Sequence, residues 1–345
     1  MTVQQIFLRT APEAWSCLKG IFCIYKPPRI SMKKVVDCIS WNLTDELNKM
    51  KYFKPDELGN AKGGVHTSLK HVDYTYHPLA LGELYHKADF TFSFVDKMLP
   101  IVSGVCVIGL GEESRSVAKK LKAAQLLSTY TLEGKLGVAT RDYYYTGNAV
   151  ERTTYDHVTA SRLERVLMKI QSHNQRRLID QLGLLPNSQA AYEVLSKGLV
   201  RPNAVQEVVL YGIKLIEFKR PHFSIEVTGV NIHADYLLNL INDIGLMARS
   251  TAHTLQIRCI RQGSFTLDLA LIRKQWFAEH IINNIAVCKP FITKMEHEHV
   301  NLLSLQDYQE EQRIVYKKQL EEKISVPSED IKLLGPSKDV NLDEK

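Results

Sequence analysis

The stretch of residues 94–109 places a carboxylate, Asp96, just ahead of an apolar segment. Residues 103–109 alternate small or turn residues with β-branched ones and stop at a Gly-Leu-Gly sequence, which predicts a buried strand. We expect chemistry in the irregular first half, where the chain enters this strand. A plain core strand produces the same apolar run, so this stretch alone leaves both interpretations open.

Lysines gather on one predicted helix, residues 114–127, whose other face is apolar. Lys119, Lys120 and Lys122 lie on the polar side. Such a face is commonly just solvated, but it can also lie along a phosphate backbone. After this helix, Tyr130 occupies a short segment flanked by threonines, which favours a strand.

Charge is unevenly distributed over the 345 residues, which suffice for one large domain or two ordinary ones. Residues 289–345 hold 9 Lys/Arg and 12 Asp/Glu, so residues 1–288 carry a net charge of +9. A basic body attracts polyanions such as RNA or DNA, although a merely soluble basic protein has the same excess. With 45% hydrophobic residues the chain can build a real core, which excludes a disordered protein.

The six cysteines have no CxxC or metal-ligand spacing and are expected to be buried thiols in a reducing compartment. No run of 18 apolar residues occurs, so we expect no membrane span. Residues 1–19 match a mitochondrial presequence weakly and are equally compatible with a short helix packed on the body.

Periodicity and end signals predict the remaining elements. Helices are expected at residues 32–47, 159–171, 186–197 and 233–244, the last ended by Gly245. Strands are expected from residue 20, at 205–218 and 223–230, and in a hairpin at 255–267. Residues 48–90 are polar without a sustained period and predict a loop-rich insertion.

Three phrases resemble the TruB family of pseudouridine synthases, over roughly residues 20–277. They are Lys26-Pro-Pro followed by Ser31; Tyr130 followed by Leu-Gly, Thr, Asp, Gly and Val-Glu up to residue 151; and Arg258 and Arg261 ahead of Gly263. The resemblance implies an α+β pseudouridine synthase fold, with a mixed, largely antiparallel central sheet flanked by helices. It also implies uridine isomerisation without a cofactor, with Tyr130 stacking on a flipped uridine and Lys26, Arg258 and Arg261 binding substrate.

Within the family, residues 150–158 and 197–202 look most like the animal mitochondrial branch. That likeness implies a protein of the mitochondrial matrix that acts on mRNA, rRNA or tRNA. The implied organisation is an N-terminal segment at 1–19, a TruB-like domain at 20–288 with its insertion at 48–90, and a charged helical tail at 289–345 without a clear PUA domain.

One departure from the family concerns the catalytic position. The family's nucleophilic Asp stands five residues before the Gly of a Gly-Val-Leu strand, and here that position is Leu99. The family's Arg partner falls on Leu238. Replacing both members of a buried ion pair avoids the cost of about 3–5 kcal/mol for leaving one charge alone, so we expect the two leucines to face each other.

Three hypotheses follow. The first is an RNA-binding protein of mitochondrial RNA metabolism that has lost catalysis and acts in RNA folding or in an RNA-processing assembly. The second is an active pseudouridine synthase in which Asp96, three residues before Leu99, is a displaced nucleophile. The third is a protein scaffold whose RNA groove is unused.

Overall fold

The computed structural model describes residues 10–50, 82, 84–181, 183–185, 187–197, 199–200, 208–297, 302–303 and 314. Its α-helices are α1 (Ala11–Cys17), α2 (Met32–Lys49), α5 (Glu113–Ala123), α6 (Ala160–Gln181), α7 (Gln189–Lys197), α8 (Ala234–Met247) and α9 (Ala278–His297). Its strands are β1 (Gly20–Lys26), β2 (Phe92–Phe94), β3 (Val102–Leu110), β4 (Ser128–Leu136), β5 (Val138–Thr140), β6 (Ala149–Arg152), β7 (Leu199–Val200), β8 (Val209–Lys219), β9 (His222–Val230), β10 (Ala252–Gln262), β11 (Phe265–Thr266) and β12 (Leu302–Leu303). Short 3₁₀ turns lie at Lys87–Asp89, Leu267–Leu269 and Arg273–Gln275.

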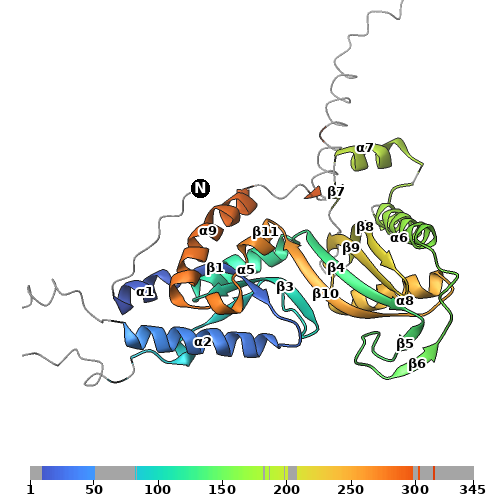
Figure 1. The fold of residues 1–345 in the computed structure, drawn as a ribbon. Helices are drawn as coiled ribbons and strands as arrows, with labels where there is room; N and C mark the ends of the chain where they lie inside the picture. The colour runs from blue at the N-terminus through green and yellow to red at the C-terminus, as the bar shows by residue number, and fades with distance from the viewer. Residues whose placement is uncertain are drawn as a thin grey trace, which may run out of the picture.

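A sheet of eight strands forms the centre of the molecule (Figure 1). Its main order is β1-β3-β10-β4-β9-β8, with β2 added to β3 and β11 to β10. Within this sheet β3 and β10 pair in parallel and the other neighbours are antiparallel. The predicted α+β class with a mixed, largely antiparallel sheet is confirmed.

Helices pack against both ends of this sheet (Figure 1). Around β1 and β3 lie α5 and α9, with α1 and α2 beside them. At the other end α6 packs on β8, while α8 packs on β10 in the middle of the sheet. The apolar faces of these helices and the sheet residues between them form one contiguous core.

The central strand β3 is buried at all nine positions, as its apolar run predicts. Gly104 has a φ of 111°, and a Cβ atom built there would lie 2.0 Å from the carbonyl oxygen of Cys259. Glycine is therefore required where β3 and β10 approach each other in parallel. This contact fixes the strand whose entry loop carries Asp96.

Gly245 does not end the helix predicted at 233–244, because α8 continues to Met247. A Cβ atom at Gly245 would lie 2.6 Å from the backbone nitrogen of Ala252. The glycine thus allows the helix to pack closely on the start of β10 rather than terminating it, which corrects the sequence interpretation.

Other helix ends also differ from the predictions. The helix predicted at residues 114–127 is α5, which spans Glu113–Ala123, and the Ser114 hydroxyl donates to the carbonyl of Gly111. Helix α6 runs to Gln181 rather than to residue 171, because buried Leu178 continues its apolar face. Helix α7 begins at Gln189, after Ser188, whose hydroxyl accepts from the backbone N–H of Ala191.

The predicted outer segments fall partly outside the described residues. Of the insertion at 48–90, residues 51–81 and 83 lie outside them, as do residues 1–9, residues 205–207 and most of the tail. Ala11 and Ala14 of α1 are buried, so residues 11–17 form a helix packed on the body. The boundary expected at residue 289 falls inside α9.

Four of the six cysteines are buried, as predicted, and all six are free thiols. Burial raises the pKa of the Cys106 and Cys288 thiols to about 12. Within the described ranges, no helix is both long and apolar enough to cross a bilayer.

Candidate active site

The loop between β2 and β3 returns on itself through a turn. The backbone N–H of Val102 donates to the carbonyl of Leu99 at 3.1 Å, which closes a four-residue turn. The Leu99 side chain is 43% exposed on this turn. The turn lies between Asp96 and β3, and Asp96 lines a hollow with Tyr130 of β4 although it is three residues further from Gly104 in sequence than Leu99 is.

Lys26, the last residue of β1, anchors the loop between β2 and β3. Its side chain is fully buried, and its Nζ donates to the carbonyls of Val102 at 2.6 Å, Pro100 at 3.2 Å and Pro27 at 3.3 Å. Burial lowers the pKa of Lys26 to about 8. The sequence assigned Lys26 to substrate binding, but its hydrogen bonds go to the backbone and position the loop.

Two hollows meet beside this loop. The Leu99 hollow, about 230 Å³, is lined by Asp96–Leu99, Val102, Tyr130, Ile232–Asp235 and Leu237. The Gln262 hollow, about 550 Å³, is lined by Val95, Asp96, Leu121, Lys122, Gln125, Leu126, Ser128, Tyr130, Asn231–His233 and Gln262. Asp96, Tyr130, Ile232 and His233 line both hollows. The larger volume falls within the range of small-molecule sites, roughly 300–1,000 Å³.

Asp96 is a half-buried carboxylate between the two hollows. Burial raises its pKa above the ordinary aspartate value. Three contacts oppose that rise: the charge of His233, the backbone N–H of Lys97 and the charge of Lys122. A carboxyl group with a perturbed pKa in a cleft is typical of a functional site.

Tyr130 lies on β4, where it pairs with Cys259 of β10, and it is only 4% exposed. Burial raises the pKa of its hydroxyl well above the usual value, and the neighbouring Cys259 and Asp96 add to that rise. The ring therefore stays neutral and forms an apolar wall beside the carboxylate, a surface on which a base can stack.

The two leucines of the proposed lost pair have different surroundings. Leu99 is exposed on the turn and lines the hollow named after it. Leu238 is 8% exposed and belongs to the hydrophobic core, and it lines neither hollow. Its neighbour Leu237 occupies the wall of the Leu99 hollow instead.

Among the predicted basic residues, Lys122 alone lines a hollow, while Lys119 and Lys120 are exposed elsewhere on α5. Arg258 lies one position from Cys259 on β10, so its side chain points to the opposite face of the sheet from Tyr130. Its guanidinium carbon is 5.6 Å from the centroid of the Tyr25 ring. Arg261 is exposed on the same strand.

Sequence reasoning missed three polar residues in these walls. His233 was interpreted only as a helix start, whereas Gln125 and Gln262 are more than nine-tenths buried and their Oε1 atoms lack a partner among the described residues. Gln125 has a φ of 49°, directly after α5, which turns it into the hollow wall. The available signal was a polar residue at the end of a core element, repeated on three segments of the chain.

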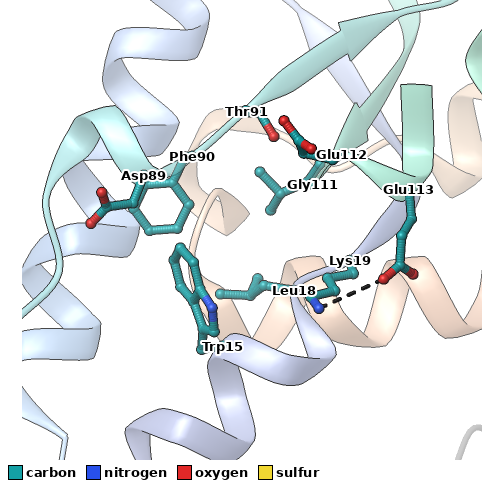
Figure 2. Close-up of a pocket in the computed structure, with 10 residues that line it drawn as sticks. Trp15, Leu18, Lys19, Asp89, Phe90, Thr91, Gly111, Glu112 and Glu113 are labelled. Carbon is teal, nitrogen blue, oxygen red and sulfur yellow. Dashed lines mark ion pairs between the residues drawn. The ribbon is translucent and has the colours of Figure 1, made fainter.

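A separate hollow of about 290 Å³ lies against α1 (Figure 2). Trp15 packs on Phe90 there with ring centroids 5.2 Å apart, and Lys19 pairs with Glu113 at 3.7 Å. None of the predicted site residues lines it. The described residues also contain no cluster of His, Cys, Asp or Glu suited to a metal ion.

Comparison with known proteins supplies the family. Residues 96–231 match the model of the TruB family pseudouridylate synthase N-terminal domain, a match that begins at Asp96. A protein named mitochondrial pseudouridylate synthase TRUB2 from Xenopus tropicalis is 35% identical over 81% of this chain and 88% of its own length. Its counterpart from Homo sapiens is 34% identical over 80% of this chain and 85% of its own. The chain belongs to the TruB family of pseudouridylate synthases.

A looser likeness links the chain to a solved archaeal box H/ACA sRNP Nop10-Cbf5 complex. The TM-score is 0.43 at 14% identity, over 82% of this chain and 65% of the other. The family assignment therefore rests on the sequence relatives.

Proposed function

We propose that this protein converts uridine to pseudouridine in RNA, with Asp96 as the nucleophile. The observation that carries the proposal is that Asp96 and Tyr130 line the same two hollows. A carboxylate and an aromatic wall at the end of a core strand give one group to attack the nucleotide and one to hold its base.

The reaction breaks the bond from uracil N1 to the ribose C1′ and forms a bond from C5 to the same carbon. A proton leaves C5 and N1 gains one, so atoms and electrons balance without a co-substrate. Asp96 would form the transient covalent bond that retains the nucleotide while the base turns, and Tyr130 would stack on the uracil once it has left the RNA helix.

The turn at Leu99–Val102 supports Asp96 over a lost nucleophile. Asp96 lies three residues further from Gly104 than the family spacing, and a displaced carboxylate loses activity steeply if it moves by even ~1 Å. The turn lets those residues fold outward with Leu99 exposed, so that the carboxylate stays beside Tyr130.

For the substrate we propose RNA of mitochondria, whether mRNA, rRNA or tRNA, and a matrix location. The mitochondrial label in the names of the relatives supports the compartment. The +9 charge of residues 1–288 supports a polyanionic partner, and Lys122 places one cation at the mouth of the Gln262 hollow.

A second candidate is an RNA-binding protein without catalysis, acting in RNA folding or within an RNA-processing assembly. Leu99 at the family spacing favours it, as does the burial that raises the pKa of Asp96 and so favours the uncharged form. The remaining alternative, a scaffold with an unused groove, predicts no salt-dependent RNA binding.

The test is pseudouridine formation by the purified full chain on uridine-containing transcripts, measured by mass spectrometry. We expect activity in the wild type, none in Asp96→Asn, and wild-type activity in Glu112→Gln, a matched removal of an exposed carboxylate beyond both hollows. Wild-type protein that binds the transcripts but forms no pseudouridine would select the second candidate.

A further inference from the structure

His233 lies where α8 begins, on the wall that the two hollows share with Asp96 and Tyr130. As the N-cap residue it has extended backbone angles, and its carbonyl accepts from the backbone N–H of Leu237 at 3.2 Å. Its imidazole makes no capping hydrogen bond. Histidine is also a weak choice for a cap compared with Ser, Thr, Asp or Asn, so capping gives no reason for this side chain here.

We propose that His233 is a positioning residue that keeps Asp96 ionised and oriented toward the nucleotide. The inference rests on the proposed function and adds to it a second residue from a different element. The 14-residue helix α8 begins directly after His233, so its partial positive end lies on the same wall as the imidazole.

The electrostatic setting agrees with this role. Burial raises the pKa of Asp96, and the charge of His233 is the largest influence that lowers it, ahead of the Lys97 backbone N–H and the Lys122 charge. Charged groups lining the hollows beside His233 are Asp235 on α8, Asp96 and Lys97 on the loop, and Lys122 on α5. The charge of His233, just before α8, thus partly offsets the desolvation of a carboxylate on a separate loop.

The rate of pseudouridine formation should depend on pH in a definite direction. Asp96 must be ionised, so activity is lost as the pH falls through its raised pKa. The wild type should therefore have an acid limb in its rate profile that is set by Asp96.

The kinetic test compares His233→Gln and His233→Arg with the wild type across the pH range on the same transcripts. His233→Gln should lower kcat about tenfold or more with little change in KM, and move the acid limb to higher pH, because the carboxylate loses its cation. His233→Arg should restore most of kcat and return the acid limb toward its wild-type position, since the guanidinium supplies a permanent positive charge. His222→Gln, at the start of β9 and outside both hollows, is the matched control.

A second measurement does not depend on turnover. Carboxyl-carbon NMR of the free protein, with the Asp96 signal assigned by Asp96→Asn, gives the titration midpoint of that group. We expect His233→Gln to raise the midpoint and His233→Arg to leave it at or below the wild-type value. An unchanged midpoint in His233→Gln overturns the inference. If His233→Gln raises the Asp96 midpoint but the wild-type protein forms no pseudouridine, the influence of His233 on Asp96 is retained and the proposed function is rejected.

Discussion

The Nζ atom of Lys26 donates a 2.6 Å hydrogen bond to the carbonyl oxygen of Val102, the first residue of β3. Two further carbonyls, of Pro100 and Pro27, accept from the same ammonium group. A fully buried cation held by backbone oxygens ties the end of β1 to the loop that carries Asp96. Such a group is costly to bury and costly to remove.

Replacing Lys26 with Met should lower the free energy of unfolding by about 2–4 kcal/mol, because buried carbonyls lose their donor. Since the pKa of Lys26 falls from 10.5 to about 8 in the folded protein, the unfolded chain binds more protons between these values. The advantage of wild type over Lys26→Met should therefore widen as the pH rises from about 8 to 10.5. Urea melts at several pH values measure this difference, and a gap that narrows as the pH rises would contradict the lowered pKa of Lys26.

Gly104→Ala should be one of the most damaging single changes in the protein. The new Cβ would meet the Cys259 carbonyl oxygen at 2.0 Å, on a backbone with a φ of 111°. We expect a loss above about 4 kcal/mol, or failure to fold. Gly212→Ala on β8 is the matched control, because nothing lies within 4 Å of its Cβ, and it should change stability by no more than about 1 kcal/mol. Equal effects in chemical melts would place the parallel contact elsewhere.

Leu99 and Leu238 should behave independently. Leu99→Asp adds a charge to an exposed turn and should cost no more than about 0.5 kcal/mol. Leu238→Arg adds a charge to the core and should cost about 3 kcal/mol or more. The double mutant should show a coupling within about 0.5 kcal/mol of zero. A strongly favourable coupling in the four melts would restore the facing pair that the sequence suggested.

Lys122 should account for more of the RNA affinity than Lys119, because it lines the Gln262 hollow and Lys119 does not. Lys122→Ala should lower the slope of log affinity against log salt by about 0.7–0.9 if it contacts one phosphate. Lys119→Ala should leave the slope nearly unchanged. Fluorescence anisotropy between about 50 and 200 mM salt measures both, and equal slopes for the two variants would mean that RNA lies along the whole helix face.

Sequence patterns were sufficient for the elements whose burial shows in their composition. The apolar run of β3 and the alternation at Phe223 and Ile225 of β9 predicted strands because one or both faces are buried. Gly245 was misinterpreted because a glycine that ends a helix and one that packs against a strand look alike in sequence. The difference depends on Ala252, which only the folded chain brings near.

For the candidate site, too, local features could be predicted from sequence, whereas contacts between distant segments could not. The strand around Tyr130 was predicted from its flanking threonines and is confirmed as β4, whereas its site role came only from the family resemblance. The place of Asp96 beside Tyr130 could not be predicted, because Pro100 favours a turn at Leu99–Val102 but does not indicate which other segment the loop packs against. The place of His233 in the site could not be predicted either. A histidine before a helix has no distinguishing pattern in sequence, and only the folded chain brings it to the same hollow as the Asp96 loop.

Because of the turn at Leu99–Val102, the number of residues in the loop and the position of the Asp96 carboxylate need not change together. Because the loop is closed by its own hydrogen bond and anchored by Lys26, residues gained or lost at its exposed tip need not move the carboxylate at its base. Under the proposed function, counting positions back from a strand then measures the length of the loop tip and not the position of the nucleophile. Two relatives could then differ in the number of residues before the strand and still hold a carboxylate at the same point in space.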